Sequence, residues 1–329
     1  MRVIIVKWSL VVVLMAGIAF SMLFGTMALD LNTVWAQGLS AQQSLVLWHI
    51  RLPRVVMAAM VGAGLAVAGV ALQSLFRNPL AEPGLIGVSS SAALGAVLII
   101  VLGAMWWGSV EAWHMSLMAF AFGIASIGFI YLIATRQGYT DVALMLLAGV
   151  ALNALTGALI GVLVFIADDI QLRSLTFWMM GSFANLSWNT TYFVGAAMGV
   201  SLIGLWWLKR PMNAFLLGER TALHMGFNPR RFKWQVMLLS ALLVSSSVSV
   251  VGVIGFVGLI VPHIIRLCCG ADHRTLLPLS ALAGASLLVY ADLFARILIS
   301  PGELPIGLLM ALLGGPFFLM MLLAKRRGF

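Results

Sequence analysis

Residues 50–76 read IRLPRVVMAAMVGAGLAVAGVALQSLF, and this long apolar run decides the class of fold. As an α-helix, a run of this length can cross a hydrocarbon core about 30 Å thick. The same character extends along the 329-residue chain, of which 62% is hydrophobic and 9% charged, with a mean hydropathy of +1.09. Because a soluble domain needs about 25% charged residues to cover its surface, the composition predicts a membrane protein.

About ten apolar runs, most of them near 20 residues and some shorter, follow one another along the chain. They lack the alternation of barrel strands, and backbone polar groups in lipid must be satisfied within each segment, so we predict helices. A further segment, 167–188, is amphipathic and predicts a short helix at the membrane interface. The expected fold class is therefore an all-α polytopic membrane protein with a single domain over residues 1–329. The predicted spans are 3–25, 50–76, 85–104, 113–135, 142–166, 190–208, 234–254, 256–268, 275–298 and 304–324.

The distribution of basic residues predicts the orientation. The first run is long for a signal peptide and no convincing small-x-small cleavage site follows it, so we predict a retained span. With the N-terminus inside, fifteen of the 19 Lys and Arg residues fall on the cytoplasmic side, as the positive-inside rule expects. Both termini are then cytoplasmic, and the net charge of +9 does not indicate nucleic-acid binding. The exceptions on the outer face are Arg51, Arg54, Arg173 and Arg296.

Several chemical functions lack their motifs. The sequence contains no G-x-x-x-x-G-K-[ST] loop, so we do not expect this chain to hydrolyse nucleotide itself. No cluster of His, Cys and carboxylate residues has metal-ligand spacing. Proton coupling would need acids inside the membrane, and the one candidate, Asp292, has Arg296 four residues later, where a helical ion pair can neutralise it. An ion-coupled carrier or channel remains the alternative of a different class.

Two cytoplasmic segments are candidates for function. The longest, about 209–233, reads KRPMNAFLLGERTALHMGFNPRRFK and predicts a short amphipathic helix. This helix can lie on lipid headgroups or dock in a groove of a cytoplasmic partner, and the residues alone favour neither. The other, FRNPLAEPGLIGVSSSAALGA over residues 76–96, breaks the backbone with prolines and glycines at membrane depth. Such backbone needs protein or a water-filled cavity around it, which favours a transport pathway.

Together, several stretches from about residue 49 to 324 resemble one family: the permease subunits of ABC importers for ferric siderophores, haem and vitamin B12, which are FecCD-type, type II importers. The resemblance implies the type II permease fold with ten helices and a homodimer with the pathway on its two-fold axis. It is carried by IRLPR, VGAGLAVAGVALQSLFRNPLAEPGLIGVSSSAALGA, LMLLAGVALNAL, LRSLTFWMMGS, RPMNAFLLGERTALHMG, GVIGFVGLIVPHIIRL, DHRTLLPLSALAGASLLVYADLFAR and ELPIGLLMALLGGPFFLMML.

The resemblance also implies the partners and the activity. Two cytoplasmic subunits would bind ATP and Mg²⁺ and hydrolyse the nucleotide, whereas the permease would hold no cofactor and catalyse no reaction. A periplasmic binding protein would deliver the chelate to this multi-pass protein of the bacterial inner membrane. We expect alternating access that moves an iron chelate, haem or a ferric siderophore, into the cytoplasm. Vitamin B12 is the alternative substrate.

Finally, the resemblance assigns roles to residues. Arg51, Arg54 and Arg296 would receive acidic residues of the binding protein; otherwise Arg296 pairs only with Asp292 and the other two extend to headgroups. The turn near Asp141 departs from the small polar residues associated with the vitamin B12 permeases. The residues expected to seat in the ATPase are Leu217, Gly218, Glu219, Ala222, Met225 and Gly226. The residues expected to form an inner gate are Asn78 and Leu80, with a second contribution from Asp141, Val142 and Ala143.

Overall fold

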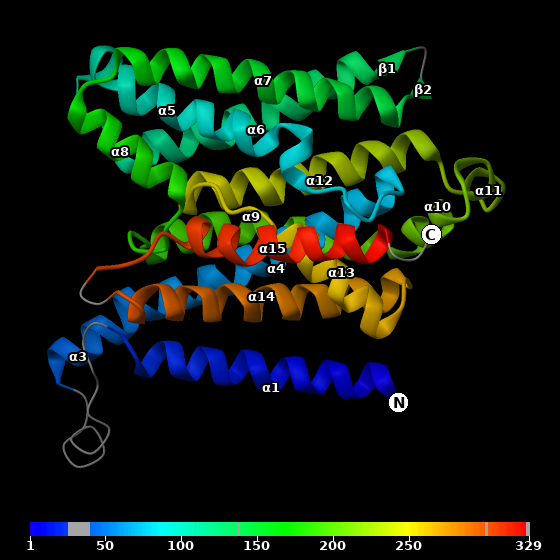
Figure 1. Ribbon diagram of the computed structural model, residues 1–329, viewed down its shortest axis with the longest axis horizontal. Coiled ribbons are helices and arrows are strands. Elements are labelled where there is room, and N and C mark those ends of the chain that lie inside the picture. The colour runs from blue at the N-terminus through cyan, green and yellow to red at the C-terminus, as the bar shows by residue number, and fades with distance from the viewer. Residues whose placement is uncertain (26–39, 109, 137–138, 300–301, 327–329) are drawn as a thin grey trace.

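The computed structural model describes residues 1–25, 40–108, 110–136, 139–299 and 302–326, and its long helices run side by side (Figure 1). Within these residues, eight helices are long and apolar enough to cross a membrane. Two shorter apolar helices, Val257–Cys269 and Ile306–Met321, occupy the eighth and tenth predicted spans. The predicted all-α class with about ten membrane helices is confirmed.

Short elements connect the long helices. A π-helical turn (η1, Val46–Arg51) leads into α4, a 3₁₀ turn (η2, Pro83–Ile86) precedes α5, and two short antiparallel strands join α6 to α7. The strands are β1 (Thr135–Arg136) and β2 (Tyr139–Thr140). The helices are α1 (Arg2–Leu23), α3 (Ala41–Leu45), α4 (Leu52–Phe76), α5 (Val88–Trp107), α6 (Ala112–Ala134), α7 (Val142–Ile166), α8 (Asp169–Met180), α9 (Trp188–Trp207), α10 (Lys209–Leu216), α11 (Glu219–His224), α12 (Pro229–Val251), α13 (Val257–Cys269), α14 (His273–Ile297) and α15 (Ile306–Arg326).

Helix caps explain where two elements begin, one of which differs from the sequence prediction. α12 begins at Pro229 rather than at residue 234, because Asn228 accepts a hydrogen bond from the Arg231 N–H and Pro229 suits the first helical position. The helix thus extends beyond the apolar run. The amphipathic segment 167–188 contains α8, which Asp168 caps through the N–H of Gln171.

The core centres on α4, which is buried along most of its length. Its glycines allow backbones to touch: a Cβ on Gly62 would lie 2.1 Å from the Gly284 carbonyl oxygen in α14. At Gly69 a Cβ would lie 2.0 Å from the Gly258 carbonyl oxygen in α13. Small residues at such contacts let helices associate in lipid, where packing replaces the hydrophobic effect. These glycines therefore fix the positions of α13 and α14 against α4.

Gly62→Ala should measurably destabilise the protein. The added methyl group meets backbone rather than a mobile side chain, so α4 and α14 must separate, at a cost typical of overpacking of about 1–3 kcal/mol. The measurement is the thermal midpoint of the detergent-solubilised protein by size-exclusion chromatography. Gly128→Ala in α6 is the matched control, because nothing lies within 4 Å of its Cβ position. Equal midpoints for the two variants would contradict the close contact.

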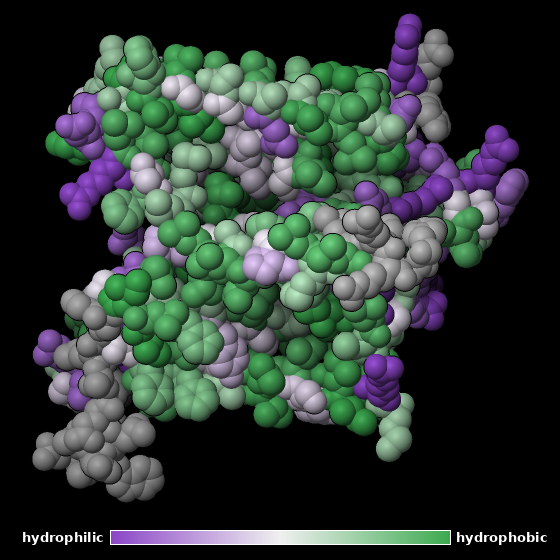
Figure 2. All heavy atoms as spheres, viewed as in Figure 1, coloured by the Kyte–Doolittle hydropathy of each residue, from purple (hydrophilic) through white to green (hydrophobic). Residues whose placement is uncertain are grey.

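The two ends of the helix bundle differ in what they carry. The start of α1 and the end of α15 lie at the same end as α10, α11 and the β1–β2 turn, whereas α3 and α8 lie at the other end (Figure 1). Figure 2 shows apolar side chains over the body of the molecule and polar ones gathered towards its ends. The predicted topology makes the α10–α11 end cytoplasmic and the α3–α8 end outer.

Candidate functional site

At the α3–α8 end, which the predicted topology places outside, two arginines meet two carboxylates inside the protein. The Arg54 Nε atom lies 2.9 and 3.0 Å from the two carboxylate oxygens of Asp292. The Nη atoms of Arg54 also bind Glu303 at 3.0 and 2.9 Å. The Arg296 Nε atom lies 3.2 Å from Asp292 Oδ2, which confirms the helical ion pair predicted from the sequence. Asp292 therefore pairs with two arginines at once, and Glu303 supplies the second negative charge.

The third arginine of the docking prediction is buried beside this cluster. Arg51 donates hydrogen bonds to the carbonyl oxygens at the end of α1, at 2.5 Å to Met22 and 3.1 Å to Leu23. Arg51, Arg54 and Arg296 are 4%, 6% and 4% exposed. The alternative interpretation is therefore wrong: Arg51 and Arg54 do not extend to headgroups, and Arg296 does not pair with Asp292 alone, because all three guanidinium groups are enclosed and bonded within the chain. A docking role for them remains a prediction.

Both predicted gate turns have local structural roles. α4 ends at Arg77 in the left-handed region with φ +47°, and the Asn78 side chain then accepts the Leu80 N–H at 3.0 Å. At the start of α7, Asp141 Oδ1 accepts the N–H groups of Ala143 at 2.8 Å and Leu144 at 3.2 Å. These bonds stabilise a turn and a helix end. Gating by Asn78, Leu80, Asp141, Val142 and Ala143 remains a prediction.

The cytoplasmic segment 209–233 folds as two short helices, α10 and α11, where the sequence predicted one. Gly218 separates them with φ +117°, and Gly226 follows α11 with φ +87°. Ala222 is fully buried, whereas the side chains around it point outward: Leu217 is 67%, Leu223 57% and Met225 55% exposed. These three exposed apolar residues lie at a polar end of the molecule, and together we call them the coupling patch. Such a patch is typical of a binding surface.

A buried lysine connects this segment to the start of α7, and the sequence analysis did not identify it. Lys233 Nζ lies 2.8 Å from Glu219 Oε1 in α11 and 2.8 Å from the Thr140 carbonyl oxygen. Thr140 directly precedes Asp141, the cap of α7. One ammonium group thus joins α11, α12 and the β1–β2 turn. The signal that could have found it is its position, since Lys233 lies one residue before a predicted span.

α10 is held to the start of α14 by polar contacts. The Asn213 amide donates to Asp272 Oδ1 at 2.7 Å, and Asn213 Oδ1 accepts the N–H of His273 at 2.9 Å. Asp272 also accepts the Arg274 N–H at 2.9 Å and caps α14. These hydrogen bonds, the backbone bond first, lower the pKa of the Asp272 carboxyl. The contact therefore favours the ionised carboxylate and anchors α10 to the bundle.

Most of the broken segment from residue 81 to 96 packs inside the protein, as its prolines and glycines predict, whereas Arg77, Asn78 and Pro79 are exposed. The carboxylate of Glu82 accepts the backbone N–H of Phe256, which adopts φ +68° in the break between α12 and α13. Below it, Gln73 donates to the Gly258 carbonyl oxygen at 3.2 Å and accepts from Arg266 at 2.7 Å. Irregular backbone from two parts of the chain is therefore satisfied by side chains at membrane depth.

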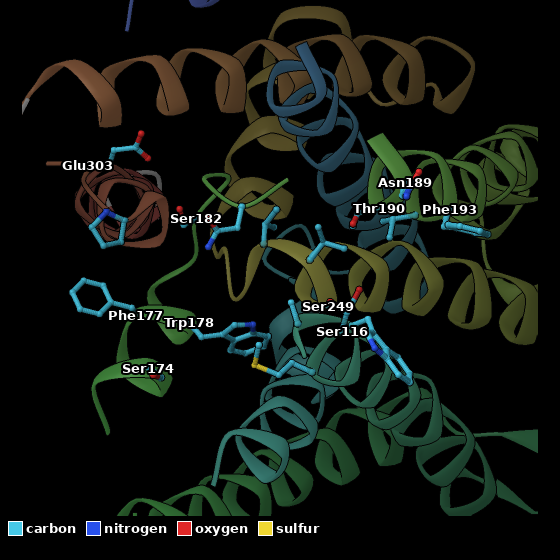
Figure 3. Close-up of a pocket in the computed structure, with 18 of the residues that line it drawn as sticks. Ser116, Ser174, Phe177, Trp178, Ser182, Asn189, Thr190, Phe193, Ser249 and Glu303 are labelled. Atoms are coloured by element: carbon cyan, nitrogen blue, oxygen red, sulfur yellow. The ribbon is translucent and has the colours of Figure 1, made fainter. Parts of the chain in front are cut away.

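Near the outer end lies a cavity of about 670 Å³ (Figure 3). Its walls come from α8, the starts of α6 and α9, the end of α12 and the residues before α15. Backbone hydrogen bonds fix two of these walls, because the Ser182 N–H donates to the Val251 carbonyl oxygen at 2.9 Å and the Ile306 N–H to that of Gly181 at 3.0 Å. The cavity also contains Glu303, so it adjoins the arginine cluster.

Comparisons with known proteins agree on one family. The model of the FecCD transport family matches residues 13–324. The Hemin transport system permease protein HmuU of Yersinia pestis is 44% identical over 307 residues, which cover 92% of this chain and 90% of HmuU. The Vitamin B12 import system permease protein BtuC of Escherichia coli O9:H4 (strain HS) is 43% identical over 285 residues, covering 86% and 85%.

A solved structure is similar over almost the whole length. It is described as an inward-facing conformation of a metal-chelate type ABC transporter. The TM-score is 0.87 at 34% sequence identity, and the match covers 96% of this chain and 98% of that one. The predicted type II ABC permease fold is therefore confirmed.

Proposed function

Because this chain belongs to the FecCD transport family, whose members here are ABC importer permeases, we propose that it carries an iron chelate, haem or a ferric siderophore, into the cytoplasm. The family match over residues 13–324 carries the proposal. Support for an iron chelate comes from the similarity to a protein named as a hemin permease. The sequence also lacks a G-x-x-x-x-G-K-[ST] phosphate-binding loop, which agrees with ATP hydrolysis by a partner subunit.

In this proposal, two copies of the chain form the transport pathway between them. Two cytoplasmic ATPase subunits, which bind ATP and Mg²⁺, sit against the α10–α11 end, and a periplasmic binding protein delivers the chelate to the other end. The chain itself holds no cofactor and lies in the bacterial inner membrane with both termini cytoplasmic. The positive-inside distribution of its basic residues supports this orientation.

The coupling patch and Lys233 can transmit the movement of the ATPase subunits to the membrane helices. Closure of the ATPase pair on ATP displaces α11, whose Glu219 is bonded to Lys233. Lys233 also holds the Thr140 carbonyl oxygen, so the displacement reaches the cap of α7 at Asp141. Helix α7 then moves with its neighbours, and the pathway opens alternately to the two sides. Release requires the pathway to bind the chelate weakly.

Cobalamin import is the second candidate, supported by the 43% identity to a protein named as a vitamin B12 permease. Membership of the family therefore does not determine the substrate, which must be identified by experiment. The test is uptake of ⁵⁵Fe-haem, a ⁵⁵Fe-siderophore and ⁵⁷Co-cobalamin in a strain that lacks this gene, with and without the gene restored. We expect restoration of uptake for an iron chelate only.

Restored uptake of cobalamin alone would favour the second candidate. A purified complex should also contain an ATPase subunit. Uptake into reconstituted vesicles should require ATP on the side of the membrane where the ATPase subunits lie. Uptake that persists without ATP in those vesicles would indicate an ion-coupled carrier and would contradict an ATP-driven importer.

A further inference from the structure

The outer cavity has the composition of a site for an amphipathic molecule. Its aromatic walls include Trp113 of α6, Phe177 and Trp178 of α8, and Phe193 of α9 (Figure 3). Between them are neutral polar groups, such as those of Asn189. A volume of about 670 Å³ falls in the range of sites that enclose small molecules, roughly 300–1,000 Å³. The walls therefore suit a molecule with broad apolar faces.

The charge inside the cavity is already compensated. Glu303 is the charged residue among its described lining, and both its oxygens bind Arg54. Arg51, Arg54 and Arg296 are buried and bonded within the chain, so none of them reaches an anion in the cavity. A negatively charged ligand needs a cation from elsewhere.

Arg173 on α8 supplies that cation. It is the remaining outer-face arginine, its side chain is exposed, and it forms no ion pair with any residue that the structure describes. It precedes Phe177 by four residues, so the two side chains share a face of α8 one turn apart. Phe177 lines the cavity. Arg173 thus directly precedes Ser174 and lies one helical turn before Phe177, both of which line the cavity, so the helix geometry favours a position of its guanidinium group near the rim.

We propose that this cavity is an outer binding site for a flat, amphipathic metal chelate with carboxylates on its edge, and that Arg173 binds one carboxylate while the aromatic side chains cover the faces. The proposal rests on the proposed function and narrows its substrate to the haem type. A tetrapyrrole with propionate groups has this chemistry. A corrinoid is bulkier and presents mainly amides, for which an unpaired arginine offers no charge complement.

The test measures haemin binding to the full-length permease in nanodiscs, with empty nanodiscs as the background. Arg173→Gln should weaken binding about tenfold, the equivalent of about 1.4 kcal/mol, because a hydrogen bond to a charged group is lost. Arg173→Lys should keep part of the affinity, because lysine keeps the positive charge but lacks the planar guanidinium group that can donate two parallel hydrogen bonds to a carboxylate. Arg136→Gln is the matched control: Arg136 is an exposed arginine at the opposite end of the molecule and should bind haemin like wild type.

Haemin dimethyl ester keeps the ring of haemin but lacks its free carboxylates, so it separates the contribution of the carboxylate charge from that of ring packing. It should bind wild type about tenfold more weakly than haemin does, and Arg173→Gln should not weaken it further. Trp178→Ala should weaken both ligands alike, because the aromatic wall contacts the ring rather than its carboxylates. Equal haemin affinity in wild type and Arg173→Gln, or tighter binding of cyanocobalamin than of haemin by wild type, would overturn the proposal.

These outcomes are distinct from failure of the proposed function. Wild type that restores no iron-chelate uptake and assembles with no ATPase would contradict the proposed function. Wild type that restores haem uptake, with haemin binding insensitive to Arg173→Gln, would contradict this site alone.

Discussion

Replacing Asp292 with asparagine should reduce the thermal midpoint of the detergent-solubilised protein sharply and lower the yield of folded material. The carboxylate is completely buried and pairs with both Arg54 and Arg296. Asparagine keeps the shape but removes the charge, so Glu303 is left to neutralise the cluster. Breaking a buried ion pair by removing one partner costs about 3–5 kcal/mol, because a desolvated charge is left without compensation.

Two further variants make this prediction specific. Glu303→Gln should cost less, because the Glu303 side chain is 31% exposed and water can solvate what it leaves behind. Asp292→Asn combined with Arg296→Met should recover part of the loss, since it removes one cation together with its anion. If Asp292→Asn melts at the wild-type temperature, the cluster does not hold α4 and α14 together.

The same cluster changes how a docking role can be tested. Reversing Arg51, Arg54 and Arg296 to glutamate would place new anions beside Asp292 and Glu303, so lost docking could reflect lost folding. Arg51→Gln is the more informative variant, since Arg51 binds backbone carbonyl oxygens rather than a carboxylate. Binding-protein affinity should be measured only on variants that keep the wild-type thermal midpoint.

Replacing Leu217, Leu223 and Met225 together with serine should separate the permease from its ATPase and abolish uptake. Each side chain is more than half exposed, so serine disturbs little inside the chain. Burying a large apolar side chain contributes about 1.5–3 kcal/mol when it is complete. Three half-exposed side chains therefore account for at least about 3 kcal/mol, or roughly a hundredfold in affinity.

The measurement is the amount of ATPase that co-purifies with the tagged permease at equal expression. Leu267→Ser is a control, because Leu267 is an exposed leucine in the last turn of α13 and is not one of the three residues of the coupling patch. It should retain both the ATPase and uptake. Normal co-purification and uptake by the triple variant would contradict docking in the ATPase. They would favour the other interpretation that the sequence allowed, in which the coupling patch lies on lipid headgroups.

Much of the fold was predictable because apolar length and charge placement are local signals. The eighth span, predicted at 256–268, is α13 at Val257–Cys269, even though Pro262 lies inside it. Helix ends were less predictable where they continue beyond the membrane. α12 includes the charged residues Arg230, Arg231 and Lys233, which a hydropathy pattern assigns to a loop, whereas the cap at Asn228 determines where the helix begins.

The site was predictable only where partners are close in the sequence. Asp292 and Arg296 are one helical turn apart, so their pairing follows from spacing. The Arg54–Glu303 pair spans 249 residues, and the Lys233–Glu219 pair joins separate helices, so neither follows from local pattern. Counting charges on each side of the membrane also gives no information on burial, so it could not predict that Arg51, Arg54 and Arg296 are enclosed.

The distance between Arg54 and its counter-ion has a consequence for biosynthesis. Arg54 and Asp292 are 238 residues apart, and a ribosome adds about 5–20 residues per second. Helix α4 therefore leaves the ribosome about 12–50 s before the acid that neutralises it exists. During this interval Arg54 must remain hydrated at the outer surface, because an arginine within the lipid core costs about 2.5–3.5 kcal/mol even on insertion scales. Nascent chains that stop before α14 should keep the outer end of α4 at the membrane surface, where a membrane protease can recognise it.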